Sequence, residues 1–122
     1  MALPGKHAPS LRTGLFDGVG TVKVWSLLQE RAEPFTAVLS CELDPSGHVG
    51  RHKQQEFPEI IIGIEGDGEA TIGGVRRALG PGDTVYLPLG EVMELRNLSE
   101  SAPLRYLIIK ARTASAGAEP GR

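Results

Sequence analysis

Short runs of β-branched and aliphatic residues divide this sequence, and their spacing constrains the fold most strongly. Gly, Pro, Asp and Ser interrupt the runs about every ten residues, which is typical of an all-β sandwich or barrel. A helix-like stretch from Trp25 to Arg31 competes poorly with a strand in the same place. The predicted strands are residues 20–28, 35–43, 49–54, 58–65, 68–72, 76–79, 84–87, 92–97 and 103–111.

Glycine pairs in "EGDGEATIGG", residues 65–74, predict two tight reversals of the chain. Asp67-Gly68 is one hairpin signal, and Gly73-Gly74 is a second. The segment lacks the G-x-G-x-x-G order and is followed by strand-like residues, so it does not predict a phosphate site at a helix N-terminus.

A chain of 122 residues is the size of one domain. We expect a flexible N-terminal arm over residues 1–13, because Pro4, Gly5 and Pro9 interrupt it. The barrel should span residues 14–112, and the small, polar residues 113–122 should form a disordered tail.

Charge and composition exclude several classes of protein. The net charge is −2 and the basic residues are scattered, so no nucleic-acid partner is expected. The longest apolar run, residues 60–64, is far shorter than the roughly 20 residues of a spanning helix, and no secretory signal follows Lys6. We therefore expect no membrane partner and a cytoplasmic location. Cys41 is the only cysteine, which predicts a small buried hydrophobe and no disulfide within the chain.

His52, Gln54 and Glu59 form the first candidate site. If residues 48–54 are extended, His52 and Gln54 share one face with Cα atoms about 6.6 Å apart. His48 would share that face about 13 Å from His52, so it joins the site only if the chain bends at Gly50. Glu59 begins the next predicted strand and can face His52. The alternative is that both residues are simply exposed at strand ends.

The spacing of these residues resembles the first sequence motif of the cupin family. Gly47, His52, Gln54, Glu59 and Gly66 are separated by four, one, four and six residues. The family pattern is a glycine, His-x-His, three or four residues, a glutamate, six residues and a glycine.

A second stretch, from Gly82 to Asn97, resembles the second cupin motif. Pro88, Gly90 and Met93 follow Gly82 at the spacing of the family's Pro-x-Gly and histidine. Together the motifs cover about residues 35–111, including "GPGDTVYLP". The resemblance implies a double-stranded β-helix, or jelly-roll, barrel and a homodimer.

The resemblance also implies a metal site built from three histidines and a glutamate. His52 and Glu59 match that set, whereas Gln54 and Met93 replace histidines. An amide oxygen suits hard cations and a thioether suits copper(I), so the two replacements favour incompatible metals. We expect a metal-poor or weakly binding site, with one divalent transition metal on these four residues as the alternative.

Small barrels commonly hold one small ligand, and we expect this one to be lined by both apolar and polar residues. Met93 could instead be core, Asn97 a turn residue bonded to backbone, and Tyr86 could face either way. The predicted lining is Ile61, Tyr86, Met93, Leu95 and Ile108 with His52, Gln54, Glu59 and Asn97.

These features favour a protein that binds a small polar organic molecule in its barrel. One alternative is a metal-dependent oxygenase, isomerase or cyclase using His52 and Glu59. The same histidine and glutamate would also suit acid/base chemistry as a proton-transfer pair. Another is an interaction protein with a filled barrel. The apolar "TVKVWSLL" strand, residues 21–28, would be hazardous at an open sheet edge, so we expect it to pair across a two-fold in the homodimer.

Overall fold

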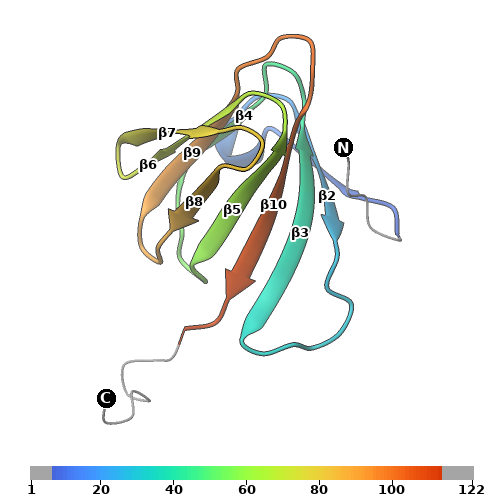
Figure 1. The fold of residues 1–122 in the computed structure, drawn as a ribbon, viewed down its shortest axis with the longest axis vertical. Coiled ribbons are helices and arrows are strands. Elements are labelled where there is room, and N and C mark those ends of the chain that lie inside the picture. Colours follow the sequence, from blue (N-terminus) through green and yellow to red (C-terminus); the bar gives the residue numbers. More distant parts are fainter. Residues whose placement is uncertain (1–6, 114–122) are drawn as a thin grey trace.

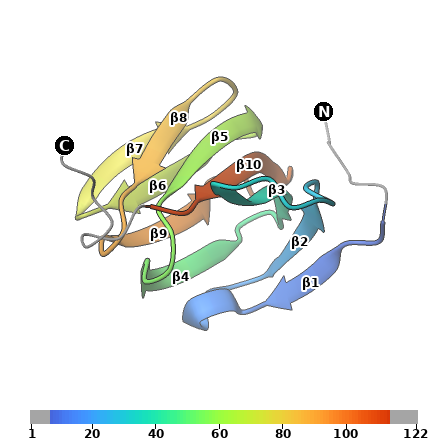
Figure 2. The ribbon, with the colours of Figure 1, turned by 90° about the horizontal axis from the view of Figure 1, so that it is seen from below.

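The strands of this protein form two antiparallel sheets that face each other (Figures 1 and 2). A computed structural model describes residues 7–113. The larger sheet has the order β1-β2-β3-β10-β5-β8, and the smaller has the order β4-β9-β6-β7. The elements are β1 (Ser10–Thr13), η1 (Leu15–Asp17), β2 (Thr21–Ser26), β3 (Phe35–Leu43), β4 (His48–Lys53), β5 (Glu59–Glu65), β6 (Gly68–Ile72), β7 (Val75–Leu79), β8 (Thr84–Leu87), β9 (Val92–Asn97) and β10 (Leu104–Ala111).

Each of the predicted strands is present, with ends that agree within two residues. The N-terminal arm differs from the prediction, because Ser10–Thr13 form β1 and pair with Thr21–Val24 of β2. This short polar segment lacks the apolar alternation that reveals a strand in sequence, and all four of its residues are exposed. Residues 1–6 of the predicted arm and 114–122 of the predicted tail lie outside the described residues.

From β3 onward the chain crosses between the two sheets at every connection except the β6–β7 hairpin, which is the path of the predicted jelly roll. β3, β5, β8 and β10 lie in the larger sheet, while β4, β6, β7 and β9 lie in the smaller. The all-β, double-stranded β-helix prediction is therefore confirmed. None of the helices within residues 7–113 is long and apolar enough to cross a membrane.

Only one of the two glycine reversals is a hairpin. Ile72 pairs with Val75 across Gly73-Gly74, as the sequence predicts. The prediction for Asp67-Gly68 is wrong, because β5 and β6 belong to different sheets and the chain crosses between sheets there. Gly66 has φ 108°, and a Cβ on it would lie 2.7 Å from the Pro103 carbonyl oxygen, so this corner requires glycine.

The core lies between the inner faces of the two sheets. Alternate residues of each strand point inward, as in Met93, Leu95 and Asn97 of β9, while their neighbours are more exposed. Part of the space between the sheets remains open as a cavity. The largest fully buried side chains are Leu43, Ile61, Leu79, Leu87, Leu95 and Leu104.

Candidate functional site

A β-bulge in β4 decides which histidine faces the barrel interior. Val49 pairs with Leu95 and His52 pairs with Met93, with a register shift between Val49 and His52. The extra residue changes the alternation, so His52 faces inward and His48 does not. His48 instead lies beside Glu94, its Nε2 3.5 Å from Glu94 Oε1 without a hydrogen bond. The expectation that His48 and His52 share a face is therefore wrong.

The chain before β2 packs directly on the bulged part of β4. A Cβ on Gly50 would lie 1.7 Å from the Phe16 carbonyl oxygen, and a Cβ on Gly18 would lie 1.8 Å from the His48 carbonyl oxygen. Only glycines allow the two segments to approach so closely. This contact places η1 over the mouth of the barrel.

Phe16 covers one face of the His52 ring. The two ring centroids are 3.8 Å apart and the planes differ by 12°. Phe16 has φ 54° and ψ 45°, a left-handed conformation that costs a non-glycine residue about 1–2 kcal/mol. The close approach of η1 to β4 at Gly50 brings this half-exposed aromatic ring beside the histidine.

The orientation of His52 is set by a backbone hydrogen bond. Nδ1 of His52 lies 2.8 Å from the Gly50 carbonyl oxygen. A carbonyl only accepts hydrogen bonds, so Nδ1 carries the proton of the neutral ring. Nε2 is then left with a lone pair, which can accept a hydrogen bond from a ligand.

Gln54, Glu59 and Lys110 form a polar network beside His52. The Gln54 side-chain nitrogen donates a hydrogen bond to Glu59 Oε2. Lys110 is the register partner of Glu59 across β5 and β10, and its Nζ lies 3.9 Å from the same oxygen. Burial raises the pKa of Glu59, although Lys110 and the hydrogen bond from Gln54 oppose this effect. Within residues 7–113, the Glu59 carboxylate is thus held by two side chains, those of Gln54 and Lys110.

Cys41 and Tyr106 lie opposite each other on β3 and β10, further along the same inner face. Burial raises the pKa of the Cys41 thiol to about 12. Burial also raises the pKa of Tyr106 well above its ordinary value. Both groups are therefore neutral at physiological pH, which makes Cys41 a poor nucleophile and confirms it as a small buried side chain.

These residues surround a cavity of about 490 Å³. Leu15, Phe16, Val22 and Val24 form the N-terminal side of its wall. Because this space exists, the barrel is not filled by its own side chains. The other lining residues are Arg12, Leu39, Cys41, Val49, His52, Lys53, Gln54, Gln55, Glu56, Glu59, Met93, Leu95, Tyr106, Ile108 and Lys110.

Three predicted lining residues lie elsewhere. Tyr86 is 60% exposed because it alternates with the buried Val85 and Leu87 on the outer side of β8. Ile61 is fully buried in the core. Asn97 is buried at the end of β9 and does not line the cavity. Its Nδ2 donates to the carbonyl oxygens of Leu43, Asp44 and Ala102, so it is the backbone-bonded turn residue of the alternative prediction.

Several cavity residues were not predicted from the sequence. Lys110 and Cys41 could have been found from strand alternation, since each shares its inward face with apolar neighbours two residues away. Phe16 had no such signal, because it lies in an irregular segment and reaches His52 only through the contact at Gly50.

The donors present do not fit the metal centre that the resemblance implies. His52 has the geometry of a metal-binding histidine, with Nδ1 bound to a carbonyl oxygen. However, Gln54 directs an N–H group at Glu59, and Lys110 brings a positive charge to the carboxylate that a metal would need. No group of three or more His, Cys, Asp or Glu side chains within residues 7–113 is arranged to hold a metal ion.

Comparison with solved structures shows the same fold in several proteins. A predicted oxalate decarboxylase from Thermotoga maritima has a TM-score of 0.81 and 22% identity over 93% of this chain and 99% of its own. A conserved barrel domain protein of the Cupin 2 type from Salinispora arenicola has a TM-score of 0.64 and 25% identity over 80% of this chain and 78% of its own. The cupin domain of an XRE family transcriptional regulator from Enterobacter cloacae has a TM-score of 0.66 and 22% identity over 76% of this chain and 98% of its own.

The family assignment depends on the sequence as well as on the fold. No curated protein matches the chain. The family model for the cupin domain matches residues 39–110, which includes both motifs and more than half of the chain. This chain therefore belongs to the cupin domain family.

Proposed function

We propose that this protein binds a small organic molecule in the barrel cavity and does so without a tightly bound transition metal. The observation that carries the proposal is the Gln54–Glu59–Lys110 network at one side of a cavity lined by both apolar and polar side chains. The Glu59 carboxylate already accepts a hydrogen bond from Gln54 and forms an ion pair with Lys110. His52 bonds to the backbone through Nδ1, so its Nε2 can accept a hydrogen bond from a ligand. A ligand with an apolar body and one polar end matches this lining.

The size and charge of the cavity narrow the class of ligand. Its volume lies within the roughly 300–1,000 Å³ of small-molecule sites. Three basic and two acidic side chains line it, a formal net charge of +1, whereas the whole chain carries −2. This excess of positive charge favours a carboxylate or another anionic group on the ligand.

Metal content tests the metal-poor part of the proposal. We expect protein purified without a His-tag and without added metal to contain less than about 0.1 equivalent of iron, manganese, nickel, copper or zinc, since so few suitable ligands converge. The measurement is elemental analysis by mass spectrometry. A near-stoichiometric metal that disappears in the His52→Ala, Glu59→Ala double variant would contradict the proposal.

Thermal unfolding with a panel of small molecules tests the binding part. The panel contains small mono- and dicarboxylates, with neutral sugars for comparison, and includes oxalate because a protein of similar fold is a predicted oxalate decarboxylase. A carboxylate at ten times its dissociation constant should raise the Tm by about 5 °C.

Two matched variants show whether any such shift comes from the cavity. Ile108→Trp adds volume to the cavity wall and should abolish the ligand-induced shift. Val75→Trp adds the same side chain at an exposed position of β7 and should leave the shift unchanged. A shift that survives Ile108→Trp, or no shift with any compound, would count against binding in the barrel.

A further inference from the structure

The barrel cavity is elongated, and strand register gives its length. Leu43 pairs with Leu104 across β3 and β10 near one end, and Lys110 pairs with Glu59 at the other, where Gln54 also reaches the carboxylate. Leu104 and Lys110 are six residues apart, so the two levels are separated by about 20 Å at the rise of a strand. The side chains that line the cavity between these levels are Val24, Leu39, Cys41, Tyr106 and Ile108.

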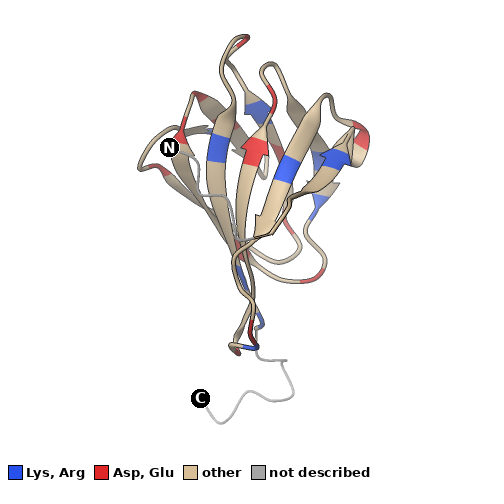
Figure 3. Cartoon of the chain, turned by 90° about the vertical axis from the view of Figure 1, so that its right-hand side faces the viewer, with Lys and Arg blue, Asp and Glu red and all other residues tan. Residues whose placement is uncertain are grey.

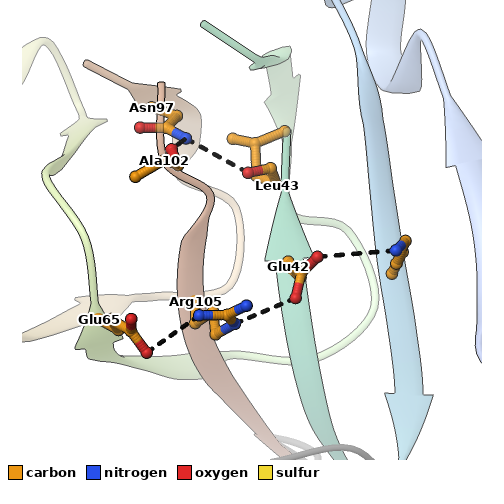
Figure 4. A network of polar contacts seen from close by, with 7 residues as sticks. Glu42, Leu43, Glu65, Asn97, Ala102 and Arg105 are labelled. Carbon is orange, nitrogen blue, oxygen red and sulfur yellow. Dashed lines mark hydrogen bonds and ion pairs between the residues drawn. The ribbon is translucent and has the colours of Figure 1, made fainter. Parts of the chain in front are cut away.

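The facing strand, β4, runs between the same two levels. Asn97 donates its backbone N–H to the Gly47 carbonyl oxygen at 2.9 Å and its Nδ2 to the Leu43 carbonyl oxygen at 3.3 Å (Figure 4), so Gly47 lies level with Leu43. Gln54 stands at the other level. His52 precedes Gln54 by two residues, which places it about 7 Å from that level and about 13 Å from the level of Leu43.

Arg12 stands at the Leu43 end of the cavity. It pairs with Val22 of β2, which pairs in turn with Leu43, and the burial of Val22 shows that this face points inward. Arg12 shares the inward face and lines the cavity. Burial is the main cause that raises the pKa of Cys41, and the charges of Lys110 and Arg12 act against it. The two cations therefore approach the same thiol from opposite ends.

β1 carries Arg12 and also covers β2. Because β1 and β3 lie on either side of β2, residues 21–26 do not form the edge of the sheet. The expectation that residues 21–28 would lie at an open edge is therefore wrong, and the homodimer inferred from it stays a prediction.

The guanidinium of Arg12 is available to a ligand. No ion pair within residues 7–113 uses it. Arg105 differs, because its Nε lies 3.0 Å from Glu42 Oε1 and its Nη1 lies 3.0 Å from Glu65 Oε1 (Figure 4). In Figure 3, blue and red bands alternate across strands that are otherwise mostly tan. An arginine that lines a cavity without such a neighbour matches the carboxylate of a ligand, which it can bind through two hydrogen bonds.

The opposite end of the cavity offers hydrogen-bond acceptors. His52 is bonded to the Gly50 carbonyl oxygen through Nδ1, so its Nε2 has a lone pair. Lys110 is paired with the Glu59 carboxylate, which also accepts from Gln54. A hydroxyl group, which donates a hydrogen bond and carries no charge, suits this end better than a second carboxylate.

We propose that the cavity binds an elongated hydroxy acid, with its carboxylate on Arg12, its apolar chain along β3 and β10, and its hydroxyl donating to His52 Nε2. This inference rests on the proposed function and names the ligand class of the same cavity. The roughly 13 Å between the two levels is shortened by the reach of the Arg12 side chain. The probe is therefore ω-hydroxyoctanoate, a straight chain with a hydroxyl at one end and a carboxylate at the other.

Isothermal titration calorimetry with matched compounds tests both ends of the ligand. ω-Hydroxyoctanoate should bind roughly 10-fold more tightly than octanoate, which lacks the hydroxyl, and roughly 10-fold more tightly than the matching α,ω-diol, which lacks the carboxylate. γ-Hydroxybutyrate carries both groups on a chain too short to join the two ends, and should bind more weakly than ω-hydroxyoctanoate. Suberate, with a carboxylate at each end, should also bind more weakly.

Two variants assign the ends to residues. Arg12→Gln should weaken ω-hydroxyoctanoate binding roughly 10-fold and leave binding of the diol unchanged, which shows that the cavity is intact. Arg76→Gln, at an exposed position of β7 outside the cavity lining, should change neither. His52→Phe keeps a ring beside Phe16 but removes the acceptor, and should abolish the preference for ω-hydroxyoctanoate over octanoate.

The outcomes separate this inference from the proposed function. Binding of short carboxylates without preference for ω-hydroxyoctanoate, tighter binding of suberate, or unchanged affinity in Arg12→Gln would each overturn the hydroxy acid and leave a small-molecule site in the barrel standing. A panel in which no compound binds would overturn both.

Discussion

Two buried polar side chains, Asn97 and Glu59, differ in what satisfies them. Asn97 is 4% exposed and Glu59 is 6% exposed, so both are removed from water to a similar extent. Asn97 donates to three backbone carbonyl oxygens and accepts from the Ser99 backbone N–H. Glu59 contacts the side chains of Gln54 and Lys110 and faces the cavity.

Under the proposed function, this difference separates a structural role for Asn97 from a binding role for Glu59. Backbone partners are fixed by the strands and turns, so the Asn97 end of the barrel is held in one arrangement. Side-chain partners can rotate away when a ligand enters, so the Glu59 end can exchange its internal contacts for contacts to a bound molecule. Changes at the two residues should therefore affect different properties.

The largest effect is expected for Asn97→Ala. It leaves several buried backbone groups without their partner and should lower the free energy of unfolding by about 3 kcal/mol. Urea denaturation measures this loss. Ser99→Ala, which removes only hydroxyl contacts to Ser101 and Ala102 in the same turn, should cost less than about 1 kcal/mol. If both variants lost the same free energy of unfolding, the backbone contacts of Asn97 would not have the structural importance inferred for them.

The second-largest effect is a gain of metal binding beside His52, in the barrel cavity. Gln54→His together with Met93→His places two further imidazoles beside His52, since Met93 is its register partner. Zinc affinity should rise at least about 100-fold, equal to about 2.7 kcal/mol. Isothermal titration calorimetry measures this change. If affinity did not rise, Gln54 and Met93 would not stand at ligand positions.

The smallest effect is the pH dependence that Glu59 contributes. Burial raises the pKa of Glu59, so the folded protein holds this proton more tightly than the unfolded chain does. The stability that Glu59 contributes is fully present below its pKa in the unfolded chain. This contribution is lost as the pH rises through the pKa of Glu59 in the folded protein. Glu59→Gln removes this loss, so it should become more stable relative to wild type as pH increases over that interval.

Urea titrations at a series of pH values from 4 to 8 measure this difference. Glu100→Gln, at an exposed position, is the matched control and should show no such trend. If Glu59→Gln instead became less stable relative to wild type with rising pH, the sign would be wrong and the role of burial would be contradicted.

The fold could be predicted from the sequence because local signals and long-range pairing agree. Segments such as 35–43 and 92–97 contain the β-branched and aliphatic residues that favour strands, and their observed bounds match those expected. β1 could not be predicted, because it is short, polar and stabilised by pairing with β2. The Asp67-Gly68 turn has hairpin chemistry, but the chain there changes sheet.

The candidate site was only partly predictable for a different reason. His52, Gln54, Glu59 and Met93 were found by motif spacing, and all four line the cavity. The inward turn of His52 and the outward turn of His48 depend on a bulge that alternation rules do not anticipate. Whether these side chains bind a ligand stays a prediction.

The position of η1 matters for where this protein can be divided. The family match begins at residue 39, yet Leu15, Phe16, Val22 and Val24 precede it and form one side of the cavity. A fragment trimmed to the family match would lack that wall. Conversely, exchanging residues 7–38 for those of another cupin would replace the wall while keeping His52 and Glu59, so under the proposed function ligand preference should change with the N-terminal segment.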